Sequence, residues 1–137
     1  MELKNPNIMS HTLGPYGAFI QLKPLDLKAG HAKIELPIRE EYKNPFGYVH
    51  CGVIYSLVEY AMGYAVQSIL DEKEMSATIQ ANIHFISGIR EGSLICESKI
   101  TKEGKQVAYL QSIVFCKDKV VAESMGTYFL RRNSGKS

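Results

Sequence analysis

The sequence predicts an α+β fold in which an antiparallel sheet wraps around one long central helix. The first observation is the segment 53–70, whose apolar residues cover most of the circumference of a helix, as in a buried helix. The second is that flanking segments alternate between apolar and polar residues, which is typical of half-buried strands. The third is that short connections join the last segments, which indicates antiparallel hairpins.

Length and composition fit one domain. The chain has 137 residues, 45% of them hydrophobic, and a formal net charge of +2. We therefore expect one domain over 1–137, with the segment 1–16 and the tail 132–137 peripheral. The balanced charge gives no electrostatic case for nucleic acid or an anionic membrane as a partner. The N-terminus lacks the apolar stretch of a secretory signal, and 53–70 is too short and interrupted for a membrane span, so we expect a cytoplasmic protein.

The cysteines and histidines give no sign of a metal site. Cys51, Cys96 and Cys116 share no close spacing of the C-x-x-C kind, and their number is odd. This argues against both a disulfide framework and a zinc site, and the histidines are isolated as well. We expect reduced thiols, no bound metal and no cofactor.

The first third of the chain predicts two strands. The segment 17–27 is irregular and interrupted by Pro24, which suits an edge strand or a bulge. After a turn at 28–30, the segment 32–38 alternates regularly. The stretch 42–48 contains Asn-Pro and Gly and is expected to be a loop.

The remainder predicts one helix and four strands. The helix begins at His50-Cys51-Gly52 and ends near 71–73. The strands follow at 77–85, 93–101, 107–116 and 120–130. A sheet curled around such a helix is the hotdog arrangement. Because a single helix covers one face of the sheet only, its other face or its edge is available for a partner, and dimerisation is a natural expectation.

Glu59 is the one formally charged residue between Gly52 and Leu70. A buried lone carboxylate either finds partners or becomes protonated. Two interpretations stay open on these grounds. Glu59 could serve chemistry, or it could form hydrogen bonds in a polar seam at a subunit contact, because structural networks also hold carboxylates.

The start of the same helix offers a second reactive group. Free backbone N–H groups at a helix start can bind an anion or a developing oxyanion. Combined with a carboxylate, such donors could polarise a thioester carbonyl while the carboxylate acts as base or nucleophile. The separation from His50 to Glu59 is 59 − 50 = 9 residues, roughly 13 Å along the axis at about 1.5 Å per residue. A dimer in which the helix start of one chain faces Glu59 of the other would bring the two together.

The string Asn44-Pro45-Phe46-Gly47-Tyr48-Val49-His50-Cys51-Gly52, followed by Glu59, Ala61 and Gly63, resembles the hotdog acyl-CoA thioesterases of the phenylacetate-degradation type. Their pattern is N-x-x-G-x-V-H-G-G before a helix that carries Asp or Glu. The segment 78–85 and Arg90-Glu91-Gly92 are also similar to that family, so the resemblance extends from about Gly17 to Leu130.

The resemblance implies a set of roles. Asn44 would position the nucleophilic water or the carbonyl, and the N–H of Cys51 would stand in the oxyanion site. Glu59 of the partner subunit would be the base or nucleophile, and Thr78 would help to hold the water. The residues expected to bind substrate are His50, Gly52, Tyr48, Asn82 and, for the coenzyme A phosphates, Arg90. The substrate would be an acyl-CoA and the minimal active unit a dimer, with pairing into a tetramer left open.

Cys51 and the tyrosines allow more than one interpretation. Cys51 replaces the first glycine of the family's usual pair, which keeps the backbone donor but narrows the pocket. It could also be a reactive thiol or a small packed residue. The tyrosines around the loop and helix, Tyr48 and Tyr55 among them, could line an acyl pocket or fill the core or an interface.

Two other functions compete with hydrolysis. An acyl-thioester dehydratase or hydratase of the same fold needs a histidine base about fourteen residues before the carboxylate, where this chain has Pro45. A non-catalytic acyl-CoA binder would keep the fold and the pocket. The retained Glu59 favours an enzyme, although a carboxylate does not by itself guarantee turnover.

Overall fold

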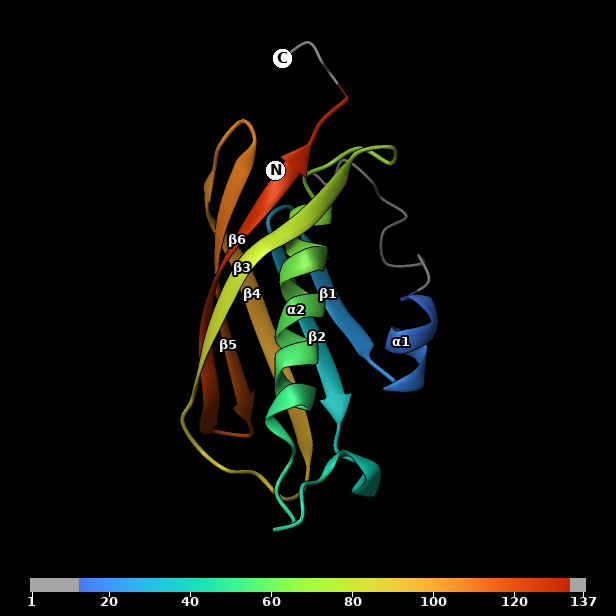
Figure 1. The fold of residues 1–137 in the computed structure, drawn as a ribbon, viewed down its shortest axis with the longest axis vertical. Helices are drawn as coiled ribbons and strands as arrows, with labels where there is room; N and C mark the ends of the chain where they lie inside the picture. The colour runs from blue at the N-terminus through green and yellow to red at the C-terminus, as the bar shows by residue number, and fades with distance from the viewer. Residues whose placement is uncertain (1–12, 134–137) are drawn as a thin grey trace.

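The computed structural model describes residues 13–133, which form a six-stranded antiparallel sheet around one main helix. The strand order is β1-β2-β4-β5-β6-β3. Figure 1 shows α2 lying along the hollow of the curled sheet, with β3 and β1 at its two edges. The elements are α1 (Gly14–Phe19), β1 (Lys23–Lys28), β2 (His31–Pro37), the 3-10 helix η2 (Glu40–Tyr42), α2 (Cys51–Gln67), β3 (Met75–Phe85), β4 (Ser93–Glu103), β5 (Val107–Cys116) and β6 (Lys119–Arg131).

The predicted fold class is confirmed, and five of the six predicted strands lie within two residues of their expected bounds. The prediction of a strand over 17–27 is wrong at its start, because α1 occupies Gly14–Phe19 and β1 begins only at Lys23. Pro15, the second residue of α1, is tolerated in a first helical turn, where its missing N–H would have no acceptor within the helix. Pro24 does lie in an edge strand, next to a register shift between Pro24 and Asp26.

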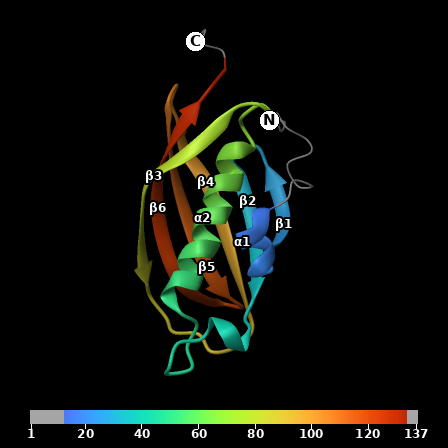
Figure 2. The ribbon, with the colours of Figure 1, turned by 45° about the vertical axis from the view of Figure 1, so that its right-hand side comes forward.

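Part of the segment expected to be peripheral lies against α2. The hydroxyl of Tyr16 is 2.7 Å from that of Ser56, and the rings of Tyr16 and Tyr60 stack with centroids 6.3 Å apart. The hydroxyl of Tyr60 also donates to the Leu13 carbonyl. Figure 2 shows α1 beside β1 and β2, on the side of the sheet that carries α2. Residues 1–12 and 134–137 of the two expected peripheral segments lie outside the described residues.

α2 is buried on the side that faces the sheet. Its fully buried side chains include Leu57, Val58 and Met62, and each such apolar side chain contributes about 1.5–3 kcal/mol to stability. The expectation that the helix is buried all round is wrong for the single chain. Glu59 is only half-buried, and Tyr55 is 39% exposed, because the sheet does not close over this strip of the helix. Within 13–133, no helix is long and apolar enough to cross a membrane.

Both ends of α2 are tied to neighbouring segments. At its end, the Ser68 hydroxyl donates to the Ala65 carbonyl at 2.6 Å and accepts the Gly30 N–H at 2.7 Å, which joins the helix to the β1–β2 turn. At its start, the Nδ1 atom of His50 caps the helix. The end of the helix is therefore attached to the β1–β2 turn, and its start is capped locally.

β3 forms one edge of the sheet along its whole length of 11 residues. One side of β3 pairs with β6, and among the described residues no strand pairs with its other side. Met75, Ile79 and Phe85 on this strand are all large, apolar and exposed. A long apolar edge strand is a template for pairing with another chain.

Candidate active site

The first turn of α2 leaves one backbone donor unused. The Nδ1 atom of His50 accepts the N–H of Gly52 at 2.8 Å, and the carbonyl of His50 accepts the N–H of Val53 at 3.0 Å. The N–H of Cys51 has no acceptor anywhere in 13–133, and Cys51 is exposed. Since Gly52 donates to His50, the free donor at this helix start is the N–H of Cys51. It is available to a carbonyl oxygen that gains negative charge.

The loop before α2 is held by the side chain of Asn44. Its Oδ1 atom accepts the N–H of Phe46 at 2.9 Å and that of Tyr48 at 3.1 Å. The backbone N–H of Asn44 donates to the Tyr48 carbonyl at 2.7 Å. Gly47 has a φ of +87°, a conformation that favours glycine. The amide oxygen of Asn44 thus shapes the loop, whereas the resemblance implied a contact with water or substrate.

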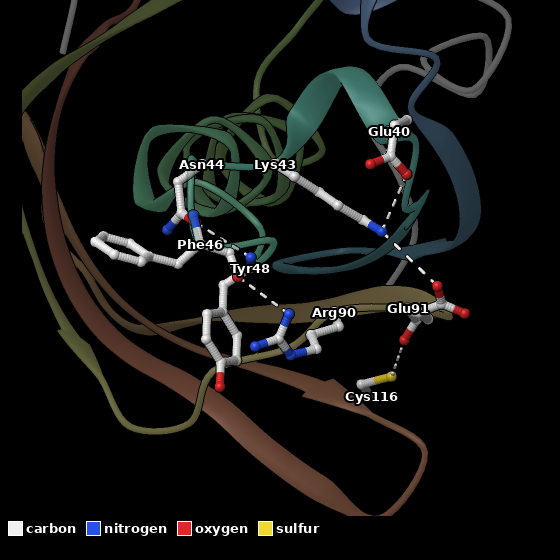
Figure 3. Close-up of polar contacts among 8 residues, drawn as sticks. All are labelled: Glu40, Lys43, Asn44, Phe46, Tyr48, Arg90, Glu91 and Cys116. Carbon is white, nitrogen blue, oxygen red and sulfur yellow. Dashed lines mark hydrogen bonds and ion pairs between the residues drawn. The ribbon is translucent and has the colours of Figure 1, made fainter.

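Arg90 reaches the same loop from the segment between β3 and β4. Its Nη1 atom donates to the Phe46 carbonyl at 3.0 Å, and its guanidinium lies 4.0 Å from the centre of the Tyr48 ring (Figure 3). A side chain on Gly47 would put its Cβ 2.6 Å from this guanidinium. Arg90 and Tyr48, both expected to bind substrate, therefore support the loop that leads into α2.

Glu59 meets two hydroxyl groups from the sheet. Thr78 Oγ1 on β3 donates to Glu59 Oε1 at 2.5 Å, and the Tyr128 hydroxyl on β6 donates to the same oxygen at 2.6 Å. Thr78 and Tyr128 are direct partners in the register of β3 and β6. The carboxylate on the helix is thus held by a cross-strand pair, and the structure brings Glu59 and Thr78 together.

Sequence reasoning missed Tyr128. The alternation of β6 puts this residue on the face toward α2, where it is 2% exposed. Burial raises the pKa of Tyr128 well above its usual range, and the hydrogen bond to Glu59 raises it further, so the hydroxyl keeps its proton. The sequence feature that could have identified Tyr128 is its hydroxyl group, which stands at an inward position of the last strand, where a buried hydroxyl needs a hydrogen-bond partner. The pairing with Thr78 was needed to connect it to Glu59.

Asn82 lies on the opposite face of the sheet from Glu59. It pairs with Met125, which is 57% exposed, and lines a shallow outer hollow of about 300 Å³ with His84, Gln111 and Glu123. Within one chain, Asn82 and Glu59 are therefore not brought together. Among the described residues, no group of three or more His, Cys, Asp or Glu side chains is placed to hold a metal ion.

The two reactive groups lie on one continuous helix and face different surroundings. Cys51 is its first residue, and Glu59 follows two turns later, against β3 and β6. At about 1.5 Å of rise per residue, the helix keeps the amide and the carboxylate too far apart to act on one carbonyl group. One carbonyl group could contact both only if the two groups came from different chains.

Comparison with known proteins identifies the group to which this geometry belongs. The family model described as "Thioesterase superfamily" matches residues 46–123, which is more than half of the chain and includes the helix start, Glu59 and Thr78. The chain belongs to the thioesterase superfamily. It is therefore a hydrolase, and the predicted resemblance to hotdog thioesterases is confirmed.

Three known proteins are similar to this chain over most of its length. A protein of Saccharolobus solfataricus named "Putative esterase SSO1253" is 26% identical over 85% of this chain and 77% of its own length. Thioesterase HI1161 from Haemophilus influenzae shares the fold with a TM-score of 0.88, at 17% identity and 96% coverage of each chain. A phenylacetic acid degradation-related protein from Ralstonia eutropha has a TM-score of 0.84 at 16% identity, covering 90% of this chain and 96% of that one.

The thiols of this thioesterase superfamily member should differ in reactivity. Cys51 is exposed at the helix start, whereas Cys96 and Cys116 are buried. Burial also raises the pKa of the Cys96 thiol to about 12, and the thiolate is the reactive form. With iodoacetamide at neutral pH, peptide mass spectrometry should find early labelling at Cys51, and labelling of all three cysteines only after denaturation. Cys51→Ala should abolish the early phase, and fast labelling of Cys96 in the folded protein would contradict the assignment.

Proposed function

We propose that the protein is an acyl-CoA thioesterase, which hydrolyses an acyl-CoA to the free acid and coenzyme A. The observation that carries this proposal is the pair of preformed groups on α2. One is the unused N–H of Cys51, and the other is the Glu59 carboxylate held by Thr78 and Tyr128. An oxyanion donor and an anchored carboxylate are the two groups that acyl transfer to water requires.

In the proposed reaction, the thioester carbonyl accepts a hydrogen bond from the N–H of Cys51. Glu59 then removes a proton from a water molecule that attacks the carbonyl carbon, or attacks that carbon itself to form an anhydride that water opens. In either route the carbon–sulfur bond breaks, the hydroxyl group of water ends on the acyl carbon, and the coenzyme A sulfur takes up a proton. The positive end of the α2 dipole also favours negative charge on the carbonyl oxygen.

The active unit in this proposal is at least a dimer. Within residues 13–133, no strand pairs with the outer side of β3, which would offer a second chain its backbone groups over 11 residues, beside exposed Met75, Ile79 and Phe85. Thr78, which holds Glu59, lies on this same edge strand. A partner that pairs there would meet the strip of α2 that carries Glu59 and could present its own Cys51 amide.

The proposal is tested with purified protein and a panel of acetyl-, hexanoyl-, benzoyl-, phenylacetyl- and palmitoyl-CoA. Turnover is best followed as loss of the ultraviolet absorbance of the thioester, because a thiol reagent would also modify exposed Cys51. We expect hydrolysis of at least one member of the panel. Binding of acyl-CoA without hydrolysis would favour a binding protein. Dehydration of a 3-hydroxyacyl-CoA in a parallel assay would favour the dehydratase alternative.

A further inference from the structure

The two oxygens of the Glu59 carboxylate differ in their surroundings. Oε1 accepts hydrogen bonds from both Thr78 and Tyr128, at 2.5 and 2.6 Å. Oε2 receives no hydrogen bond from any residue in 13–133. A carboxylate oxygen that accepts two short hydrogen bonds has little capacity left for a further partner. The oxygen that can meet a water molecule or an acyl carbon is therefore Oε2.

Tyr128 contributes to this asymmetry without access to a substrate. Its side chain is 2% exposed and lies between β6 and α2. Besides its bond to Oε1, its hydroxyl is 3.2 Å from the backbone oxygen of Glu59. These two contacts join the side chain and the main chain of Glu59 to one rigid phenol. They fix the rotation of the carboxylate relative to the helix axis.

We propose that Tyr128 is a positioning residue for catalysis, which together with Thr78 anchors Glu59 Oε1 and leaves Oε2 as the reacting oxygen. This inference rests on the proposed function, because it assigns roles within the same site. It adds a residue from the last strand that does not touch the substrate. It also divides the carboxylate into an anchored oxygen and a reacting one.

The chemistry of the phenol suits this task. Burial keeps the pKa of Tyr128 well above its usual range, and its bond to Glu59 adds to the effect, so it donates a proton throughout the pH range in which a carboxylate is charged. Anchoring also keeps the reacting oxygen in one orientation, and misplacement by about 1 Å can lower a rate a hundredfold.

The variant that tests the inference is Tyr128→Phe, assayed with whichever acyl-CoA of the panel the wild type hydrolyses fastest. We expect kcat to fall by about ten- to a hundredfold while KM changes by less than about threefold, because the phenol orients Glu59 and does not touch the thioester. Unchanged kcat would overturn the inference.

Two comparisons distinguish a general effect of Tyr128→Phe on the fold from a specific effect on the orientation of Glu59. Tyr42→Phe removes another buried hydroxyl, which donates to the Ile20 carbonyl away from Glu59, and should leave kcat within about twofold of wild type. In a double-mutant cycle, Tyr128→Phe added to Glu59→Gln should lower the residual rate by less than about twofold, because the group it positions is already lost. Additive losses would show that Tyr128 acts through the fold and would overturn the inference.

A second variant covers the case in which Tyr128→Phe does not fold. Thr78→Val removes the other donor to Oε1 and should reproduce the lower kcat, whereas Thr78→Ser should restore kcat toward wild type. Failure of Thr78→Ser to exceed Thr78→Val would contradict the anchoring of Oε1. These outcomes are distinct from failure of the proposed function, in which the wild type itself hydrolyses no acyl-CoA.

Discussion

Glu59→Gln should lower kcat for thioester hydrolysis by at least about a hundredfold, as expected when an acid–base group or nucleophile is lost. The substitution is close to isosteric, and its amide oxygen can still accept hydrogen bonds from Thr78 and Tyr128. The charge and the reacting oxygen disappear, whereas the anchor remains. Steady-state rates with the best acyl-CoA of the panel measure the loss, and thermal unfolding verifies that the variant is folded.

Glu35→Gln provides a matched control for this substitution. Glu35 on β2 also accepts a short hydrogen bond from a hydroxyl on a neighbouring strand, the Ser93 Oγ, at 2.6 Å. It lies outside the α2 site, so its replacement should leave kcat within about twofold of wild type. Comparable rates for the wild type and Glu59→Gln would remove Glu59 from the mechanism.

Cys51→Pro should be the second severe substitution, with a loss of about a hundred- to a thousandfold in kcat, the range seen when one oxyanion donor is removed. Proline deletes the backbone N–H that has no acceptor in the described chain. The fold should tolerate it, because proline is favoured at the first position of a helix. His50 already has the extended conformation required before proline, with φ −64° and ψ 137°.

Cys51→Ala is the control that keeps the N–H and removes the thiol. It should retain activity if the backbone acts, and lose activity if the sulfur does. Equal losses in Cys51→Ala and Cys51→Pro would assign the effect to the side chain. Wild-type activity in Cys51→Pro, with the helix intact by circular dichroism, would exclude this amide as the oxyanion donor.

Mixing the two inactive variants tests whether the site spans two chains. A hybrid dimer of Glu59→Gln and Cys51→Pro subunits has one site with both defects and one site with neither. Co-expression of the two chains with different affinity tags, followed by tandem purification, should therefore recover activity that neither homodimer has. No recovery in a purified hybrid would place both groups in the same chain.

The sequence predicted most of the fold because two periodicities are clear in it. The strands β2, β4, β5 and β6 alternate, and α2 is apolar on several faces, so few arrangements of these elements can bury both. The start of the chain was harder. A helix of six residues, α1, has too little periodicity to be distinguished from an irregular strand, and its contacts with Ser56 and Tyr60 are tertiary.

The site was only partly predictable because strand register is not local. Glu59 was identified as an isolated charge, and Thr78 through a family resemblance, but alternation alone would have put Thr78 on the polar, outer side of β3 with Asn82. The structure turns Thr78 inward and leaves Asn82 outward. The reason is a register shift between Thr78 and Gln80, where Ile79 is the extra residue. Such a bulge re-aims the side chains on one side of it.

This single extra residue has a consequence for how related chains should be compared. In a chain that lacked Ile79, Thr78 and Gln80 would be adjacent and would pair with Tyr128 and Thr127 in regular register, so Thr78 would still face Glu59. In a chain of the same length whose strand ran without the bulge, residues 75–78 would turn over relative to the rest of β3, and Glu59 would lose one of its two anchors. Two sequences that share every residue of the helix motif can therefore differ in catalytic competence, and the position of this bulge has to be aligned before activity is transferred between them.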